Sequence, residues 1–473
     1  MVRLAGDDVD FKPKLGLDVK YGVSSQLTLD LTVDTDFAQV EADNQQINLT
    51  RFSLFFPEKR EFFLENASIF QFARQGARRR VGGRSRLDSD LIPFFSRRIG
   101  ISQGRLVPVL GGARLSGRAG AYTLGLFSMQ TDNFEDTPST NFSVIRVRRD
   151  ILQRSDVGGI FVNKEEGNSQ HNRTYGIDGN FNFLNLLDLT SFFLKTETPG
   201  FEEEDMAGSI TVAWTDPRLQ LESQYLAIGE NFNPEVGFVP RQGIERTRGR
   251  ITWTPRPGER IPWIREFRLL NWIDYITRTS STLETRQMET RFGMDFQSSS
   301  NLLVGRRFRF ERLTEPFFIQ PDQAIPPGDY EFSEYFIDLV IDRSRMLSGE
   351  ARLATGEFFD GNRDSYRFLF GFRHGYHFQS EVSWNHDEIT LPSGDFSTDL
   401  VGARLQFSFN TRMFLNGLIQ YNSEAKEINS NIRFNLIHKP LSDFFVIYNE
   451  RRSTTGAVQE RALIAKLTYT FSY

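Results

Sequence analysis

The chain has no cysteine among its 473 residues and only seven methionines. Without cysteine there is no disulfide framework, no thiolate zinc site and no cysteine nucleophile. No apolar run approaches the roughly 18 to 20 residues of a membrane-spanning helix. Charged residues make up 25% of the chain, so an α-helical membrane protein is excluded. The 56 basic and 61 acidic residues give a net charge of -5 with no basic block, and nucleic-acid binding therefore has no support.

The first residues, MVRLAGDDVDF, lack the charged start, the apolar stretch and the small-residue cleavage site of a secretory signal. We nevertheless expect the chain to be an excerpt of an exported protein. The reason is the remaining sequence, whose pattern is typical of a structure built in a membrane that is reached by export.

That pattern is an alternation of apolar and polar residues with a period of two, which places alternate side chains on opposite faces of a strand. Residues 27–33, LTLDLTV, alternate Leu and Val with Thr and Asp. Residues 366–373 place aromatic rings such as Phe370 opposite arginines, and residues 401–409 place Phe407 opposite Gln406. One face of each strand is therefore apolar and strongly aromatic, and the other carries polar and charged groups.

About two dozen such stretches occur, many near the nine to eleven residues of a tilted membrane-spanning strand. A soluble sandwich, propeller or β-helix is the alternative, but its strands are usually shorter and its charges face bulk water. The chain has 45 Phe residues, and the apolar face of the strands is strongly aromatic. Arg, Asp and Glu lie in mid-strand on the opposite face, so that face needs a water-filled interior, whereas the aromatic face needs an apolar exterior. The sequence therefore predicts an all-β fold, a single transmembrane antiparallel barrel over residues 1–473 with roughly 22 to 26 strands.

The alternation fails between residues 37 and 91, and it resumes in a strand expected near 92–101. An irregular backbone of this length cannot lie in contact with lipid, and its many Phe residues argue against a freely solvated loop. We predict that residues 37–91 form an internal plug or constriction. The alternative is an ordinary strand pair with a structured periplasmic or surface loop.

A charged run, PEKRE, lies between two aromatic pairs within this segment. Charges in a narrow lumen need partners, which we expect on the barrel walls. The candidate lumen network comprises Glu58, Lys59, Arg60, Glu61, Asp30, Asp34, Arg97 and Arg98. A separate motif, Asn233-Pro234-Glu235 with Gly237, is predicted to form a turn between strands, with a ligand-binding loop as the alternative.

Three motifs carry a family resemblance: DFAQVEADNQQINLTRFSLFFPEKREFFLENASIF, then PFFSRRIG, and later ENFNPEVGFVPR. They resemble the outer-membrane β-barrel family known as domain of unknown function 5916, and the resemblance extends over nearly the whole chain from about residue 11. In that family the barrel usually follows an exported carbohydrate-binding, family 9-like module. The resemblance implies a barrel without a settled activity, and any sugar binding would belong to the module that is missing here.

The residues favour no catalytic, cofactor or metal site. Ser383, His386 and Asp387 have the residue types of a nucleophilic relay, but Ser383 and His386 have opposite strand parity and would face opposite sides. We therefore expect no enzyme activity and no cofactor. A hydrolase activity in the missing N-terminal module is the alternative.

The predicted function is a conduit, transport or docking component of the bacterial outer membrane, with a partly occluded polar lumen. The alternative is a membrane-anchored enzyme or carbohydrate-processing protein whose active or binding module is missing from this chain. Expected partners are outer-membrane lipid, a periplasmic or surface protein, and carbohydrate through the missing module, but no nucleic acid.

Overall fold

The computed structural model describes residues 2–5, 8–11, 14–34, 43–73, 79–81, 84–86, 91–102, 105–167, 170–201, 203–440 and 442–471. Of the predicted plug, residues 37–91, the structure describes 43–73, 79–81, 84–86 and 91. The other residues of the plug, including 37–42 and 74–78, lie outside the described residues. Among the described residues, no helix is both long and apolar enough to cross a membrane.

One antiparallel sheet of 25 strands dominates the described part of the chain. Its strands are β1 (Val2–Ala5), β2 (Asp8–Phe11), β3 (Leu17–Ser24), β4 (Leu27–Val33), β9 (Val109–Ala119), β10 (Tyr122–Thr131), β11 (Thr140–Leu152), β12 (Ser155–Glu166), β13 (Gln170–Phe183), β14 (Leu187–Glu197), β15 (Met206–Thr215), β16 (Leu219–Ile228), β17 (Ile244–Trp253), β18 (Ile264–Arg278), β19 (Leu283–Phe296), β20 (Asn301–Leu313), β23 (Gly328–Ile341), β24 (Leu347–Phe358), β25 (Gly361–His374), β26 (Phe378–Leu391), β27 (Gly394–Asn410), β28 (Met413–Asn422), β29 (Glu427–Lys439), β30 (Ser442–Ser453) and β31 (Val458–Leu467).

The remaining elements are short. Three two-stranded pairs are β5 (Arg79–Val81) with β6 (Arg84–Arg86), β7 (Ile101–Ser102) with β8 (Arg105–Leu106), and β21 (Phe317–Gln320) with β22 (Gln323–Ile325). The helical turns are α1 (Glu61–Leu64), η1 (Ala67–Phe70), η2 (Ser96–Arg98) and η3 (Gly258–Arg260).

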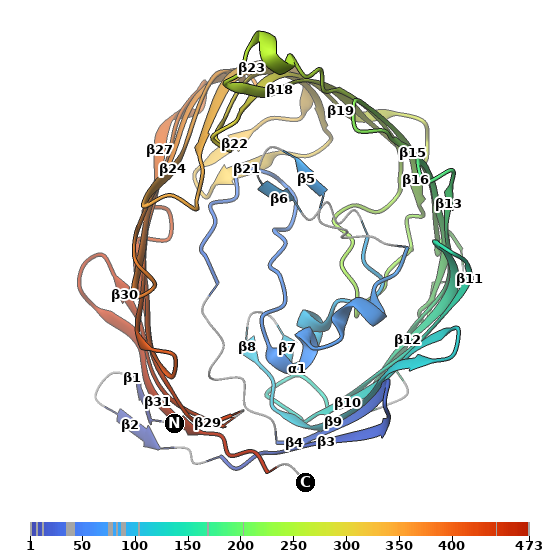
Figure 1. The fold of residues 1–473 in the computed structure, drawn as a ribbon, viewed down its shortest axis with the longest axis vertical. Helices are drawn as coiled ribbons and strands as arrows, with labels where there is room; N and C mark the ends of the chain where they lie inside the picture. The colour runs from blue at the N-terminus through green and yellow to red at the C-terminus, as the bar shows by residue number, and fades with distance from the viewer. Residues whose placement is uncertain are drawn as a thin grey trace.

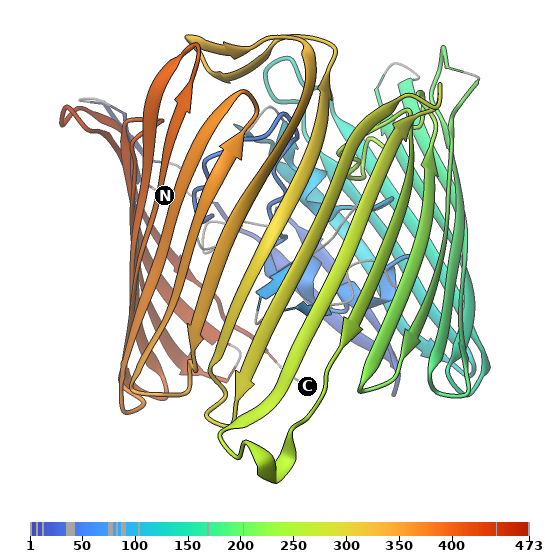
Figure 2. The ribbon, with the colours of Figure 1, turned by 90° about the horizontal axis from the view of Figure 1, so that it is seen from above.

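The sheet curls into a ring, with each long strand paired to its neighbour in the chain (Figure 1). Viewed from the side, the strands are strongly tilted, as the closure of a large barrel requires (Figure 2). β1 adds to the free edge of β31 through Val2↔Leu463 and pairs on its other side with β2. The all-β antiparallel barrel fold is therefore confirmed, and the strand number lies within the predicted range.

The outer face of the ring is apolar, as the alternation predicts. Phe370 is 54% exposed, while Ser365 on the opposite parity of the same strand is 2% exposed and faces the interior. Large apolar side chains exposed on the other strands include Leu126, Ile177, Ile210, Ile251, Val304, Ile337, Val382 and Ile419.

Part of the interior differs from the polar lumen that the sequence predicts. On β10 to β16 the inward-facing residues include Phe127, Met129, Ile160 and Leu194, and these belong to one buried apolar cluster. Phe70 and other rings from the chain inside the ring complete that cluster. One side of the lumen is therefore a dry core, because apolar chain packs against it and removes it from water.

The strand expected near 92–101 is absent. The segment instead has an isolated bridge at Ile92, the turn η2, and the two-residue strand β7. Pro93 lacks a backbone donor, and the carbonyl oxygens of Ser96 and Ile99 accept hydrogen bonds from the Arg60 side chain instead of from a neighbouring strand.

Candidate functional site

The chain inside the ring is the candidate functional site, and residues 43–73 are called the internal segment below. In Figure 1 this segment crosses the ring and brings α1 close to the wall formed by β9 to β12. It is attached to the wall by the apolar cluster and by ion pairs and hydrogen bonds around arginines.

Arg60 joins α1 to η2. Its guanidinium donates to Glu58 at 2.9 and 2.7 Å, to the Ile99 carbonyl at 2.7 Å and to the Ser96 carbonyl at 2.7 Å. The same guanidinium lies 4.2 Å from the centre of the Phe63 ring. Burial alone would raise the pKa of Glu58, but the hydrogen bonds and charge of Arg60 outweigh it and lower that pKa below its ordinary value. Glu58 is therefore ionised and holds Arg60 in place.

Arg114 on β9 holds the end of α1 against the wall. It is 2% exposed, donates to Asp30 of β4 at 2.7 Å, and also donates to the Glu65 backbone carbonyl at 2.7 Å. Lys20 on β3 forms ion pairs with Glu65 and with Asp30. Burial raises the pKa of Glu65, but hydrogen bonds and charges from Lys20 and Arg114 lower it overall. This four-residue group fixes the segment to the first strands of the barrel.

The far end of the segment is held by β11 and β13. Arg146 and Asp178 form a two-bond pair at 2.6 and 2.8 Å, and both side chains are almost fully buried. The Ala73 backbone N–H donates to Asp178 at 2.8 Å, and Arg146 donates to the Gln71 carbonyl at 3.2 Å. Because both wall charges bind backbone as well as each other, this contact specifies the path of the chain.

The middle of the segment reaches a different part of the wall. Arg51 pairs with Glu284 of β19 at 2.7 Å and with Glu311 of β20 at 3.4 Å. The Arg241 guanidinium lies 3.6 Å from the centre of the Phe52 ring. Further back, Asn44 accepts a hydrogen bond of 3.0 Å from Arg404 on β27. The segment is thus attached to three separate sectors of the ring.

The walls are shaped to receive the aromatic side chains of the segment. A Cβ atom added at Gly125 would lie 2.9 Å from Phe70, and one added at Gly176 would lie 2.9 Å from Phe72. These distances are too short for ordinary contact, so the glycines provide the space that the two rings occupy.

The three sequence motifs meet at one place inside the ring. Ile92 forms an antiparallel bridge with Phe238, and the Phe95 backbone N–H donates to the Val236 carbonyl at 2.7 Å. The Phe55 ring centre lies 5.1 Å from that of Phe95 and 5.3 Å from that of Phe238. Segments far apart in the sequence therefore form one inner structure.

Residues 2–146 match the family of domain of unknown function 5916 (DUF5916). The match supports, over this part of the chain, the resemblance that the motifs carry, and it includes the first two of them. Among solved structures, the chain is similar to OccAB3 of Acinetobacter baumannii at 11% identity and a TM-score of 0.35, covering 67% of this chain and 96% of that one. No curated protein matches the chain.

The residues of the predicted lumen network are only partly brought together. Arg97 and Arg98 lie on η2 inside the ring, not on a wall strand as expected. Arg97 forms an ion pair with Asp43, which also pairs with Lys59 at 3.4 Å. Arg98 donates to the Gly237 carbonyl at 3.1 Å.

Two predicted residues stand apart from these contacts. Asp34 ends β4 in a left-handed conformation, with φ of 50°, and its backbone N–H donates to the Leu110 carbonyl at 2.8 Å. Glu61 is exposed at the first position of α1. Neither side chain has an ion-pair partner among the described residues.

The residues that attach the segment most firmly, Arg114, Arg146 and Asp178, were not among the predicted ones. Each has the inward parity of its strand, and that parity was the only sequence signal for them. Their pairing depends on strand register and on the path of the segment, which alternation does not contain.

Proposed function

We propose that this chain is a β-barrel of the bacterial outer membrane that acts as a conduit, transport or docking component, with a lumen restricted by the internal segment. The observation that carries the proposal is the attachment of one segment to three sectors of the wall, at Arg404, at Glu284 with Glu311, and at Asp178. A segment attached in this way crosses the lumen instead of lining it.

The outer surface supports a membrane location. Its exposed side chains are apolar around the ring, and the antiparallel ladders satisfy the backbone of each long strand except at the outer edge of β3, while β1 covers the edge of β31. Catalysis forms no part of the proposal, and lipid is the first expected partner.

The two ends of the barrel suggest its orientation. The longer connections at one end are residues 34–108, 132–139, 198–205, 229–243 and 314–327, whereas the other end has mostly short turns such as 25–26 and 120–121. Barrels of the outer membrane carry longer loops outside the cell and short turns toward the periplasm. The internal segment therefore enters the lumen from the extracellular end.

The polar nature of the attachments supports a restriction that can be released. Ion pairs such as Arg51 with Glu284 are sensitive to salt and pH, unlike the apolar cluster that holds residues 63–73 against the wall. A solute or partner that competes for these charges would shift the part of the segment around Arg51 without unfolding the barrel.

Conductance in planar lipid bilayers tests the proposal. Replacing residues 52–72 with a short Gly/Ser linker should raise single-channel conductance and antibiotic permeability while the barrel still assembles, as judged by heat-modifiable migration on gels. The control is the same replacement at residues 454–457, a turn between β30 and β31, which should leave conductance unchanged. An assembled 52–72 variant that conducts like the parent would show that the segment does not restrict the lumen. If neither the parent nor the assembled 52–72 variant conducts, the chain is not a conduit.

A further inference from the structure

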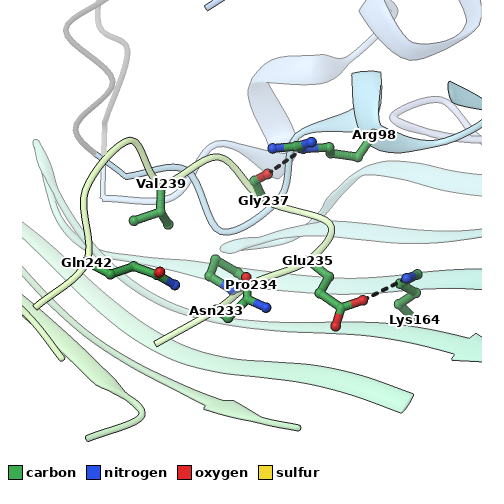
Figure 3. A pocket seen from close by; sticks show the side chains of 8 residues that line it. All are labelled: Arg98, Lys164, Asn233, Pro234, Glu235, Gly237, Val239 and Gln242. Atoms are coloured by element: carbon green, nitrogen blue, oxygen red, sulfur yellow. Dashed lines mark hydrogen bonds and ion pairs between the residues drawn. The ribbon is translucent and has the colours of Figure 1, made fainter. Parts of the chain in front are cut away.

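A polar cavity of about 350 Å³ lies where the DUF5916 motifs meet (Figure 3). It is formed by η2, by the inward-facing end of β12, and by the loop of residues 229–243 between β16 and β17. The lining residues are Arg98, Lys164, Asn233, Pro234, Glu235, Gly237, Val239 and Gln242. Binding cavities for small molecules begin at about this volume.

One end of the cavity is positively charged. The Arg98 side chain is exposed to the cavity, and its Nε donates to the Gly237 carbonyl at 3.1 Å, which holds the guanidinium in place. Within the part of the chain that the structure describes, no carboxylate lies within ion-pair distance of Arg98. The two outer nitrogens of the guanidinium remain available, in the geometry that binds a carboxylate through two hydrogen bonds.

The opposite end carries an excess of negative charge. Lys164 lies 2.6 Å from a carboxylate oxygen of Glu235 and 2.6 Å from one of Glu166. One ammonium thus faces two carboxylates, which leaves one negative charge uncompensated locally. Figure 3 places Glu235 and Lys164 across the cavity from Val239, with Arg98 above them.

The cavity is held rigidly by its surroundings. Buried Asn172 accepts from the Glu235 backbone N–H at 3.0 Å and donates to the Asn233 carbonyl at 2.8 Å. The Gly237 N–H donates to the Pro234 carbonyl at 2.7 Å, and Phe238 is bridged to Ile92. A preformed site loses little conformational entropy when it binds a ligand.

We propose that this cavity binds a small zwitterionic molecule, a free amino acid or a short peptide, with its carboxylate at Arg98 and its ammonium at Glu235, whose charge Lys164 shares with Glu166. The separated charges select for a ligand that carries both signs. The exposed amides of Asn233 and Gln242 provide further hydrogen bonds for a peptide unit. The site is defined by equilibrium binding, so it stands or falls independently of whether the barrel conducts.

Isothermal titration of the full chain in detergent micelles tests this inference with three matched probes. Glycylglycine carries both charges, N-acetylglycylglycine lacks the ammonium, and glycylglycine amide lacks the carboxylate. We expect glycylglycine to bind with millimolar or better affinity, and each blocked probe to bind about tenfold or more weakly, as the loss of one charged hydrogen-bonded contact predicts.

Two variants assign the ends of the ligand. Arg98→Gln should weaken glycylglycine about tenfold and abolish the preference for it over the amide, while Arg98→Lys should keep part of that preference. Glu235→Gln should abolish the preference over the acetylated probe. The control is Arg373→Gln, which changes an exposed arginine on β25 and should leave all three affinities unchanged.

Several results would overturn the inference. Equal binding of all three probes, or no saturable binding of any, would exclude a zwitterion site. Stronger binding of the acetylated probe than of glycylglycine would identify a simple anion site instead. An Arg98→Gln protein that migrates as a folded barrel and binds glycylglycine like the parent would remove Arg98 from the site.

Discussion

Arg146 and Asp178 form their buried pair across an intervening strand, because β12 has a glycine where they meet. A Cβ atom at Gly158 would lie 2.6 Å from the Arg146 guanidinium and 2.9 Å from the Asp178 carboxylate. The glycine thus allows residues of β11 and β13 to touch over β12. Asp178 of this pair also accepts a hydrogen bond from the Ala73 backbone N–H, which fixes the end of the internal segment.

Removing one partner of this pair should be costly. Asp178→Ala leaves the Arg146 charge and the Ala73 N–H without their acceptor, so we expect a loss of about 3 to 5 kcal/mol in the free energy of unfolding. The measurement is denaturant unfolding in micelles. The double variant Arg146→Met/Asp178→Leu should lose less than Asp178→Ala alone, and an equal or larger loss would contradict an uncompensated buried charge as the cause.

Filling the space beside Phe72 should displace the internal segment. Gly176→Val places methyl groups where the Phe72 ring and the wall side chains Leu194 and Ile160 lie, so the apolar packing of the segment is lost and we expect higher single-channel conductance from a barrel that still assembles. Gly159→Val is the matched control, because a Cβ at Gly159 meets only the Gly176 carbonyl oxygen at an ordinary 3.6 Å. If both variants conduct alike, Gly176 does not act by making room for the segment.

Acid should loosen the attachment of α1 to η2. The pKa of Glu58 is lower in the folded protein than its ordinary 4.5, so its stabilising contribution is present above pH 4.5 and is lost as pH falls through the lowered value. The pKa of Glu65 is lowered as well, and it acts in the same direction. Conductance should therefore rise on acidification below about pH 4.5.

A matched pair of variants separates Glu58 from other carboxylates. Glu58→Gln should raise conductance at neutral pH and flatten its rise in acid, whereas Glu61→Gln, on an exposed neighbour, should behave like the parent. An unchanged acid response in Glu58→Gln would show that another group controls the segment.

The face assignment of the strands can be tested by charge. Phe370→Arg and Phe407→Arg should each destabilise the inserted barrel by about 2 to 4 kcal/mol if they lie near the middle of the bilayer. Gln406→Arg, with the opposite parity on β27, should be tolerated. Refolding into lipid vesicles measures the difference, and equal losses at positions 406 and 407 would contradict the assigned faces.

The sequence alone determined the sheet and its two faces. Alternation is a local property, because successive side chains of a strand must point to opposite sides, and the exposure of Phe370 follows directly from it. The first two motifs likewise indicated the family whose model matches residues 2–146, and the loss of alternation after residue 36 marked the region from which the internal segment comes.

Only the tertiary structure decided which residues attach that segment and what lies around it. Arg114 meets Asp30 and Glu65, and Arg98 and Glu235 line one cavity, because the ring brings together strands and loops that are far apart in the chain. Four of the eight residues of the predicted network, Asp34, Glu61, Arg97 and Arg98, do not lie where the network was predicted or lack an ion-pair partner among the described residues, for the same reason. An ion pair depends on register, on the tilt of the strands and on gaps such as Gly158, and a period of two in the sequence carries none of these distances.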